Sequence, residues 1–314
     1  MREVVAEAQA SSANLGSGFD TFAVALGRPA DRLRVSGADA KLLEVEIRVP
    51  RRSGLSQDPK ENVAGVVASA ISKAFKLRKR IKITIERKVP AGLGMGSSAA
   101  SAAACAVAMN DLFGLGLSKE EMVSWAGKGE AASSGTAHYD NVSAAIYGGF
   151  VVVRSGRTPS VVRFDPPRAL RLCVATPLLR LPERKTKYAR SILPKKIELR
   201  QMVSNLGSAG TLVAGFAKGD IALIGAGMHD EVVEPARSTM IPGYGRVRKE
   251  AMEAGASGVC ISGAGPSMLA VVDVQQSRPR EVLAAMLGGF TKSGSKAEGF
   301  VTKTGEGARV VASS

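Results

Sequence analysis

The chain has 314 residues, 45% of them apolar, which suits a buried core in one large or two modest domains. No apolar run approaches the length needed to span a bilayer, and Arg2, Glu3 and Glu7 argue against a secretory signal, so we expect a cytoplasmic protein without a membrane partner. The three cysteines lack a C-x-x-C spacing, which argues against a disulfide framework or a thiolate metal site.

The basic composition raises a nucleic-acid-binding function as an alternative from a different class. The chain carries 43 Lys and Arg against 28 Asp and Glu, a net charge of +15. The basic residues are scattered, however, and aromatic residues that could stack on bases make up only 4% of the chain. We therefore expect no nucleic-acid partner, and a basic surface also attracts small anionic substrates.

The first predicted element is a strand over residues 3–9, which leads into a loop over residues 11–20. Asn14 and Asp20 are short polar side chains in an otherwise apolar stretch, so they are candidates to hold an ammonium or hydroxyl group of a small substrate. An ordinary turn is the alternative. Further strands are predicted over residues 32–49, followed by a helix over residues 62–75 with Asn62 as its cap.

The strongest local signal joins a strand to a helix through three glycines. Alternating isoleucines predict a strand over residues 81–86 that ends by Pro90, and an Ala- and Ser-rich run predicts a helix over residues 97–109. Glycines let backbone N–H groups approach a ligand, and a helix start favours an anion, so this corner suits a phosphate. Ser97 or Ser98 is expected to cap the helix while the other faces the phosphates or a magnesium ion. A flexible turn is the alternative, and the Walker and dinucleotide spacings are absent.

A second polar signature follows the next helix. A capping box at residues 118–121 opens that helix, which is expected to end near residues 128–131 beside Glu130. The segment G-x-x-H-x-D-N at residues 135–141 contains His138, Asp140 and Asn141; a lone histidine here would more often be structural than catalytic. After a strand over residues 149–154, the paired prolines after Asp165 mark a boundary between domains 1–165 and 166–314.

The second half alternates helices and strands. Strands are predicted over residues 170–175, 258–262, 268–274, 299–304 and 308–311, and helices over residues 195–218, 220–228, 245–254 and 280–287. The Gly-rich turn at residues 263–267 joins two of these strands, and it is either a plain turn or part of a site.

Five motifs in order resemble one family. The run P-x-x-x-G-x-G-S-S-A-A at residues 90–100 resembles the phosphate-binding motif of the GHMP small-molecule kinases. The motifs A-N-x-G-x-G-F-D, G-x-x-H-x-D-N, T-x-x-A-R-x-x-L-P and G-A-G-P-S, which begin at residues 13, 135, 186 and 263, point to the homoserine kinase branch, and the similarity covers nearly the whole chain. Ser17 stands where a proline is common in the family.

This resemblance implies an α+β, two-domain GHMP kinase fold, with an N-terminal ribosomal-S5-domain-2-like nucleotide domain and a C-terminal ferredoxin-like domain. It implies transfer of the γ-phosphoryl group of ATP, with Mg²⁺, to the side-chain hydroxyl of L-homoserine in threonine synthesis. Shikimate- and mevalonate-type kinases are the alternatives within the superfamily. Whether a general base takes part and whether the chain forms a homodimer both stay open.

The resemblance also implies roles for individual residues. The implied nucleotide-binding residues are Asn62, Pro90, Ala91, Gly92, Leu93, Gly94, Met95, Gly96, Ser97, Ser98, Ala99 and Ala100, and the implied magnesium ligands are Ser98 and Glu130. The implied substrate-binding residues are Asn14, Asp20, His138, Asn141, Arg190 and Arg237, and the implied catalytic residues are Asp140, Asn141, Thr186 and Arg190. The turn at residues 263–267 is expected to lie against the phosphate loop.

Overall fold

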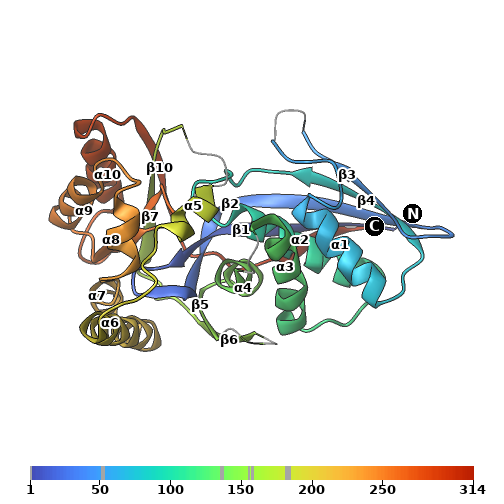
Figure 1. Cartoon of the computed structure of the whole chain (residues 1–314), viewed down its shortest axis with the longest axis horizontal. Helices are drawn as coiled ribbons and strands as arrows, with labels where there is room; N and C mark the ends of the chain where they lie inside the picture. The colour runs from blue at the N-terminus through green and yellow to red at the C-terminus, as the bar shows by residue number, and fades with distance from the viewer. Residues whose placement is uncertain (1, 51–53, 135–137, 155, 157–158, 181–184) are drawn as a thin grey trace.

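The structure is a computed structural model that describes residues 2–50, 54–134, 138–154, 156, 159–180 and 185–314. Its elements form two groups along the long axis of the molecule, each built around one sheet (Figure 1). No helix among these residues is long and apolar enough to cross a membrane.

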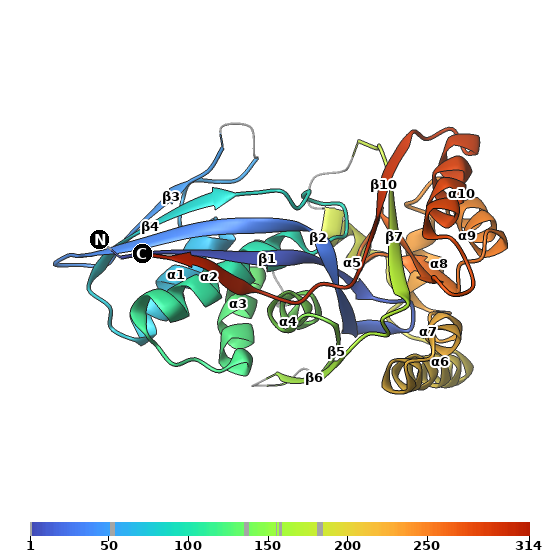
Figure 2. The same cartoon turned by 180° about the vertical axis from the view of Figure 1, so that it is seen from behind.

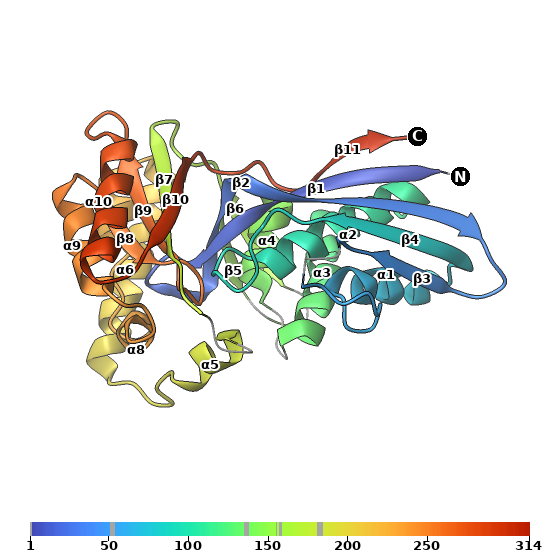
Figure 3. The ribbon, with the colours of Figure 1, turned by 90° about the horizontal axis from the view of Figure 1, so that it is seen from above.

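The larger group is a seven-stranded sheet with helices on one face. Its strand order is β11-β1-β2-β4-β3, with β5 paired to β2 and β6 to β5. The strands are β1 (Glu3–Asn14), β2 (Gly18–Asp39), β3 (Glu44–Arg48), β4 (Lys79–Glu86), β5 (Phe150–Arg154), β6 (Ser160–Phe164) and β11 (Arg309–Ser313). The helices beneath it are α1 (Val63–Ala74), α2 (Ser97–Phe113), α3 (Lys119–Ser134) and α4 (Tyr139–Tyr147) (Figure 3).

Helix α2 lies at the centre of this layer, in contact with β1, β2, α1, α3 and α4. It is buried nearly all round, since its alanines and serines let the neighbouring elements approach closely. On the sheet side, Ile81, Ile83 and Ile85 of β4 are buried, as their alternation predicts. The predicted strand–glycine–helix unit is therefore confirmed, and it runs through the core of the larger group.

The smaller group is an antiparallel sheet of order β10-β7-β9-β8. Numbered along the chain this order is 4-1-3-2, as in a β-α-β-β-α-β unit of the ferredoxin-like type, so the α+β two-domain expectation is confirmed. The strands are β7 (Leu170–Pro177), β8 (Gly258–Ile261), β9 (Met268–Asp273) and β10 (Ala297–Thr302). The helices are α5 (Lys185–Ser191), α6 (Leu199–Lys218), α7 (Ile221–Ala226), α8 (Val233–Ser238), α9 (Tyr244–Glu253) and α10 (Pro279–Lys292).

The two groups share one core. One face of the smaller sheet packs on α9 and α10, whereas the other face joins α6, α7 and the core of the larger group. The rings of Phe150 in β5 and Phe216 in α6 stack with centroids 3.9 Å apart and planes 8° apart. The groups are therefore held together by apolar packing, which fixes the position of any site between them.

The end of the chain returns to the first sheet. Strand β11 pairs with β1, and the two chain ends meet through hydrogen bonds between Glu3 and Ser314 of 3.0 and 2.9 Å (Figure 2). The last strand of the segment 166–314 therefore lies in the sheet of the segment 1–165, and the division at residue 165 stays a proposal.

The expected loop over residues 11–20 is wrong for most of its length. Strand β1 continues to Asn14 and β2 begins at Gly18, so only residues 15–17 turn. Ser11 and Ser12 are buried and pair with Ala25 and Val24, so these small polar residues belong to a strand rather than to a loop. Strand β6 was also not predicted.

Candidate active site

The glycine loop between β4 and α2 is tightly packed. Gly92, Gly94 and Gly96 all have positive φ angles, of 74°, 81° and 62°. A Cβ atom on Gly94 would lie 2.2 Å from the backbone oxygen of Ser262, and one on Gly96 would lie 2.2 Å from Ser11 Oγ. The loop therefore requires glycine both for its backbone conformation and for the close approach of its neighbours.

The start of α2 differs from the expectation. Gly96, not a serine, is the N-cap residue, and no side chain caps the helix. The Ser97 hydroxyl instead donates to the Val89 carbonyl oxygen (2.9 Å) and accepts a hydrogen bond from Arg87 Nε (3.0 Å). Since Ser98 is the partly exposed serine of the pair, the open N–H groups of the first turn and the Ser98 hydroxyl form the part of α2 suited to an anion.

Asp31 anchors this corner, and sequence reasoning missed it. Its carboxylate accepts hydrogen bonds of 2.8 Å from the backbone N–H groups of Lys88 and Val89 and from the Ser101 hydroxyl. Burial raises the pKa of Asp31. The aspartate fixes the end of β4 to α2, but nothing in its local sequence distinguishes it from a surface residue of a strand.

The remaining implied nucleotide residues occupy different environments. The Asn62 side chain caps α1 by accepting from Ala64 N (3.0 Å), as predicted, and donates to the Ser56 carbonyl oxygen (2.8 Å). Ala91 is exposed, whereas the methyl groups of Ala99 and Ala100 are fully buried in the core. The two buried alanines can therefore offer a ligand only their backbone.

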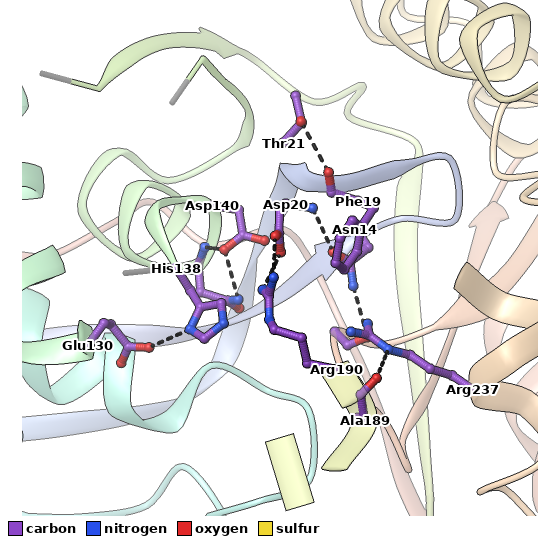
Figure 4. A network of polar contacts seen from close by, with 12 residues as sticks. Asn14, Phe19, Asp20, Thr21, Glu130, His138, Asp140, Ala189, Arg190 and Arg237 are labelled. Atoms are coloured by element: carbon purple, nitrogen blue, oxygen red, sulfur yellow. Dashed lines mark hydrogen bonds and ion pairs between the residues drawn. The ribbon is translucent and has the colours of Figure 1, made fainter. Parts of the chain in front are cut away.

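A second cluster lies where the two groups of elements meet, and four of the implied substrate residues contribute to it (Figure 4). The Asp20 carboxylate accepts two hydrogen bonds of 2.9 Å from the guanidinium group of Arg190. Asn14 accepts a hydrogen bond from Asp20 N (3.2 Å) and donates to the Gly263 carbonyl oxygen (2.9 Å). Residues far apart in the sequence thus hold complementary charges side by side.

Arg237 completes this cluster from α8. Its side chain is only 4% exposed, and it donates to the carbonyl oxygens of Gly263 (3.0 Å) and Ala189 (3.3 Å). The guanidinium groups of Arg190 and Arg237 both lie over the Phe19 ring, at 5.4 and 5.2 Å from its centroid. Burial lowers the pKa of Arg237 to about 10, so the group stays charged at neutral pH. Arg237 is therefore a buried cation rather than a surface charge.

The third cluster comes from α3 and α4. His138 Nδ1 lies 3.5 Å from Glu130 Oε2, and this contact raises the pKa of His138. Asp140 is 2% exposed, and burial raises its pKa to about 6. Asn141 donates to Asp140 through its backbone N–H (2.7 Å) and accepts from the Ser11 hydroxyl (2.9 Å). Sequence reasoning gave Glu130 and His138 separate roles, whereas the structure pairs them; residues 135–137 of the motif lie outside the described residues.

The turn at residues 263–267 connects these clusters. As expected, it lies against the glycine loop, because the Ser267 backbone N–H donates to the Leu93 carbonyl oxygen (3.4 Å) and the preceding Ser262 hydroxyl donates to the Gly94 carbonyl oxygen (2.8 Å). Lys185 of α5 is buried, and its Nζ donates to the carbonyl oxygens of Ala264 (3.2 Å) and Gly265. The neighbouring Thr186 is exposed. Sequence reasoning named Thr186 and missed Lys185, whose only signal is its place beside the motif.

The arrangement suits transfer of an anionic group between two bound molecules. A glycine cradle and an open helix start favour a polyphosphate, and the pair of arginines with Asp20 favours a zwitterion. Among the described residues there is no group of three or more His, Cys, Asp or Glu that could hold a metal. A single carboxylate such as Glu130 with one hydroxyl is nevertheless a fitting donor set for Mg²⁺, which takes most of its ligands from phosphates and water.

Comparisons with known proteins agree on one family. The profile of the GHMP kinases N terminal domain matches residues 62–149, and that of the GHMP kinases C terminal matches residues 212–288. A homoserine kinase of Methanocella arvoryzae is 42% identical over 313 residues, which cover 99% of this chain and 98% of the relative. A homoserine kinase of Thermoplasma acidophilum is 44% identical over 271 residues, which cover 86% and 85%.

Solved structures show the same fold. The crystal structure of a homoserine kinase from Cytophaga hutchinsonii superposes with a TM-score of 0.91 at 35% identity and covers 98% of this chain and 97% of its own. A mevalonate kinase of L. major superposes with a TM-score of 0.64 at 18% identity, covering 96% and 95%, so its similarity concerns the fold alone.

Proposed function

The chain belongs to the homoserine kinases of the GHMP kinase superfamily, and from this membership we propose that it transfers the γ-phosphoryl group of ATP to the side-chain hydroxyl of L-homoserine. The observation that carries the substrate assignment is the Asp20–Arg190 pair beside buried Arg237. A zwitterionic amino acid needs an opposite charge for each of its ends once it leaves water. This cluster offers both signs within one site.

In the proposed complex, the substrate inserts between Asp20 and Arg190 and replaces their mutual contact. Asp20 accepts from the ammonium group, with Asn14 and His138 beside it, while Arg190 and Arg237 donate to the carboxylate through their forked guanidinium groups. The Phe19 ring lies beside both guanidinium groups and helps to hold them near each other. Asp20 and Arg190 each exchange their present partner for an end of the substrate, so substrate entry leaves neither of these two charges unpaired.

The nucleotide is proposed to lie along the glycine loop. Its phosphates would accept from the backbone N–H groups of residues 94–99, and Asn62 would lie near the adenine. Ser98 and Glu130 would hold Mg²⁺, which neutralises charge on the phosphates when it is bound. His138 would orient the Glu130 carboxylate through their contact.

Catalysis is proposed to rest mainly on positioning and charge. The acceptor oxygen forms a bond to the γ-phosphorus, the bond from that phosphorus to the bridging oxygen breaks, and the hydroxyl proton leaves. Asp140, whose pKa of about 6 suits a base at neutral pH, is the candidate acceptor of this proton, and Asn141 orients both Asp140 and the hydroxyl. Thr186 stays a catalytic candidate only if the exposed start of α5 closes over the substrate.

The proposal is tested by coupling ADP release to acceptor alcohols. We expect turnover with L-homoserine and little with mevalonate, shikimate or an alcohol of the same length without the carboxylate. Equal rates with the alcohol that lacks the carboxylate would move the arginines to the nucleotide and overturn the substrate assignment. The reaction compartment is proposed to be the cytoplasm, and sedimentation would show whether a homodimer forms.

A further inference from the structure

No carboxylate among the described residues forms an ion pair with the buried side chain of Lys185. This side chain is 6% exposed, and its ammonium group donates to the carbonyl oxygens of Ala264 (3.2 Å) and Gly265. The charged group that acts on it is Arg237, a second cation. An ammonium group removed from water is costly unless an anion balances it, and carbonyl oxygens supply only dipoles. An anionic ligand can therefore balance the charge of Lys185 at this position.

Lys185 lies between the nucleotide loop and the acceptor cluster. Its acceptor, the Gly265 carbonyl oxygen, would be 2.9 Å from a Cβ atom on Gly94, so one carbonyl group separates the lysine from the glycine loop. The adjacent Gly263 carbonyl oxygen accepts from Asn14 and Arg237. In the proposed complex, the transferred phosphoryl group passes beside this turn on its way from the loop to the acceptor.

We infer that Lys185 contacts the transferred phosphoryl group and balances its charge. A lysine has three donors on a flexible stem, so it can keep one hydrogen bond to Gly265 while it donates another to a non-bridging γ-oxygen. Charge is spread over these oxygens in the transition state, and a nearby cation stabilises it. The ammonium group keeps its proton throughout: the acceptor oxygen bonds to phosphorus, the bridging bond breaks, and the hydroxyl proton leaves to Asp140 or solvent.

Proton uptake by Lys185 on nucleotide binding supports the inference, and it can be measured without turnover. Burial and Arg237 lower the pKa of Lys185 to about 7, so the free amine is largely neutral at pH 8. The other charged residues of α5 are Lys187, which is exposed, and Arg190, which pairs with Asp20 from β2. A triphosphate beside the amine would favour the ammonium form, so nucleotide binding at pH 8 should take up a proton.

The test is calorimetry of Mg²⁺ with a non-hydrolysable ATP analogue at pH 8, in buffers of different ionisation heat. We expect the intact chain to take up close to one proton more per nucleotide than Lys185→Met, and to lose this difference when ADP replaces the analogue. Lys187→Met, on the exposed face of the same helix, should behave like the intact chain. In turnover, Lys185→Met should lower kcat by about 10²–10³-fold, with Lys185→Arg recovering part of it.

Equal proton uptake by the intact chain and a folded Lys185→Met variant would overturn the inference. A role confined to holding the turn would instead raise the KM for homoserine and lower the melting temperature without changing the proton count. The inference rests on the proposed kinase function, but the calorimetric measurement needs no acceptor alcohol. Absence of turnover with homoserine, together with normal proton uptake, would therefore reject the acceptor and keep the lysine at the phosphate.

Discussion

At the level of single residues, Asp140 is placed in a site that disfavours its own charge. Burial raises its pKa from 3.8 to about 6. The folded state therefore binds a proton more tightly than the unfolded chain, so stability from this group falls as the pH rises from about 4 to about 6 and stays lost above that range. In the proposed mechanism, this raised pKa suits Asp140 to accept a proton near neutral pH.

Asp140→Asn should consequently stabilise the fold at pH 8 by as much as ~3 kcal/mol and have little effect at pH 4. The asparagine oxygen can still accept the Asn141 N–H, so the geometry survives. Thermal unfolding at both pH values measures the difference in stability between the variant and the intact chain. Asp165→Asn, which changes an exposed aspartate, is the control. A stability difference that does not change with pH would contradict the buried-charge explanation. If the variant also keeps its kcat, the proton leaves to solvent or phosphate.

Arg237 is the residue on which homoserine binding should depend most directly. Arg237→Met is expected to lower kcat/KM for homoserine about ten- to a hundredfold, equivalent to roughly 1.5–3 kcal/mol for a charged hydrogen bond, with little change in the KM for ATP. Arg237→Lys should recover little, because lysine lacks the forked donors that bind Gly263, Ala189 and a carboxylate together. Arg280→Met, an exposed arginine of α10, controls for net charge. A loss confined to ATP would place the arginine at the nucleotide.

The sequence predicted which polar residues lie in the candidate site, but it did not predict which of them contact one another. Asp20 and Arg190 were both named, but their pairing spans 170 positions and no local pattern encodes it. Asp31 and Lys185 were missed for the same reason: each is important only because distant backbone groups surround it. The motifs therefore predicted which polar residues lie in the candidate site, whereas their burial and pairing came from the fold.

At the level of elements, local signals predicted the long helices well, but they missed the shorter helices α4, α5 and α8 and placed strand ends poorly. The Asn62 cap and the reciprocal Ser118–Glu121 capping box are both confirmed, since each is made within one turn of chain. The start of α2 was predicted within a residue, but not its cap, because Val89 and Arg87 bind the Ser97 hydroxyl first. Strand β6 depends on pairing with β5 rather than on its own pattern.

The glycine loop and the turn at residues 263–267 should act as one unit. Gly94→Ala places a methyl group 2.2 Å from the Ser262 backbone oxygen, which cannot move without displacing the turn. Gly116→Ala has a similar φ of 67° and open space, so it should cost only the left-handed conformation, about 1–2 kcal/mol. We expect Gly94→Ala to destabilise more than Gly116→Ala and to weaken ATP binding, which Gly116→Ala should leave intact. An ATP affinity in a folded Gly94→Ala protein equal to that of the intact chain would show that the glycine loop and the turn act independently.

At the level of the whole molecule, the path of the chain was the least predictable feature. The paired prolines and the family resemblance predicted two domains, but nothing local in residues 309–313 indicates that they pair with β1 at the other end of the chain. The contact of residues 15–17 with the second half is equally non-local: the Ser17 hydroxyl donates to the Gly227 carbonyl oxygen (2.7 Å). The site between the groups depends on these long-range contacts.

A shared core predicts that the two groups unfold together. Phe216 is 4% exposed and stacks on fully buried Phe150, so Phe216→Ala removes the main aromatic contact between the groups and should cost about 3–5 kcal/mol. Phe216→Leu, which fills more of the space, should cost less.

Trp125, the one tryptophan, lies in α3 of the larger group, so its fluorescence reports that group while ellipticity reports the whole chain. We expect both probes to give one midpoint in the intact chain and to shift together in Phe216→Ala, because a core that joins both groups is lost as a unit. Should the tryptophan transition stay in place while the ellipticity splits into two steps, the groups are separately stable, and the substrate site between them would depend on docking rather than on a common core.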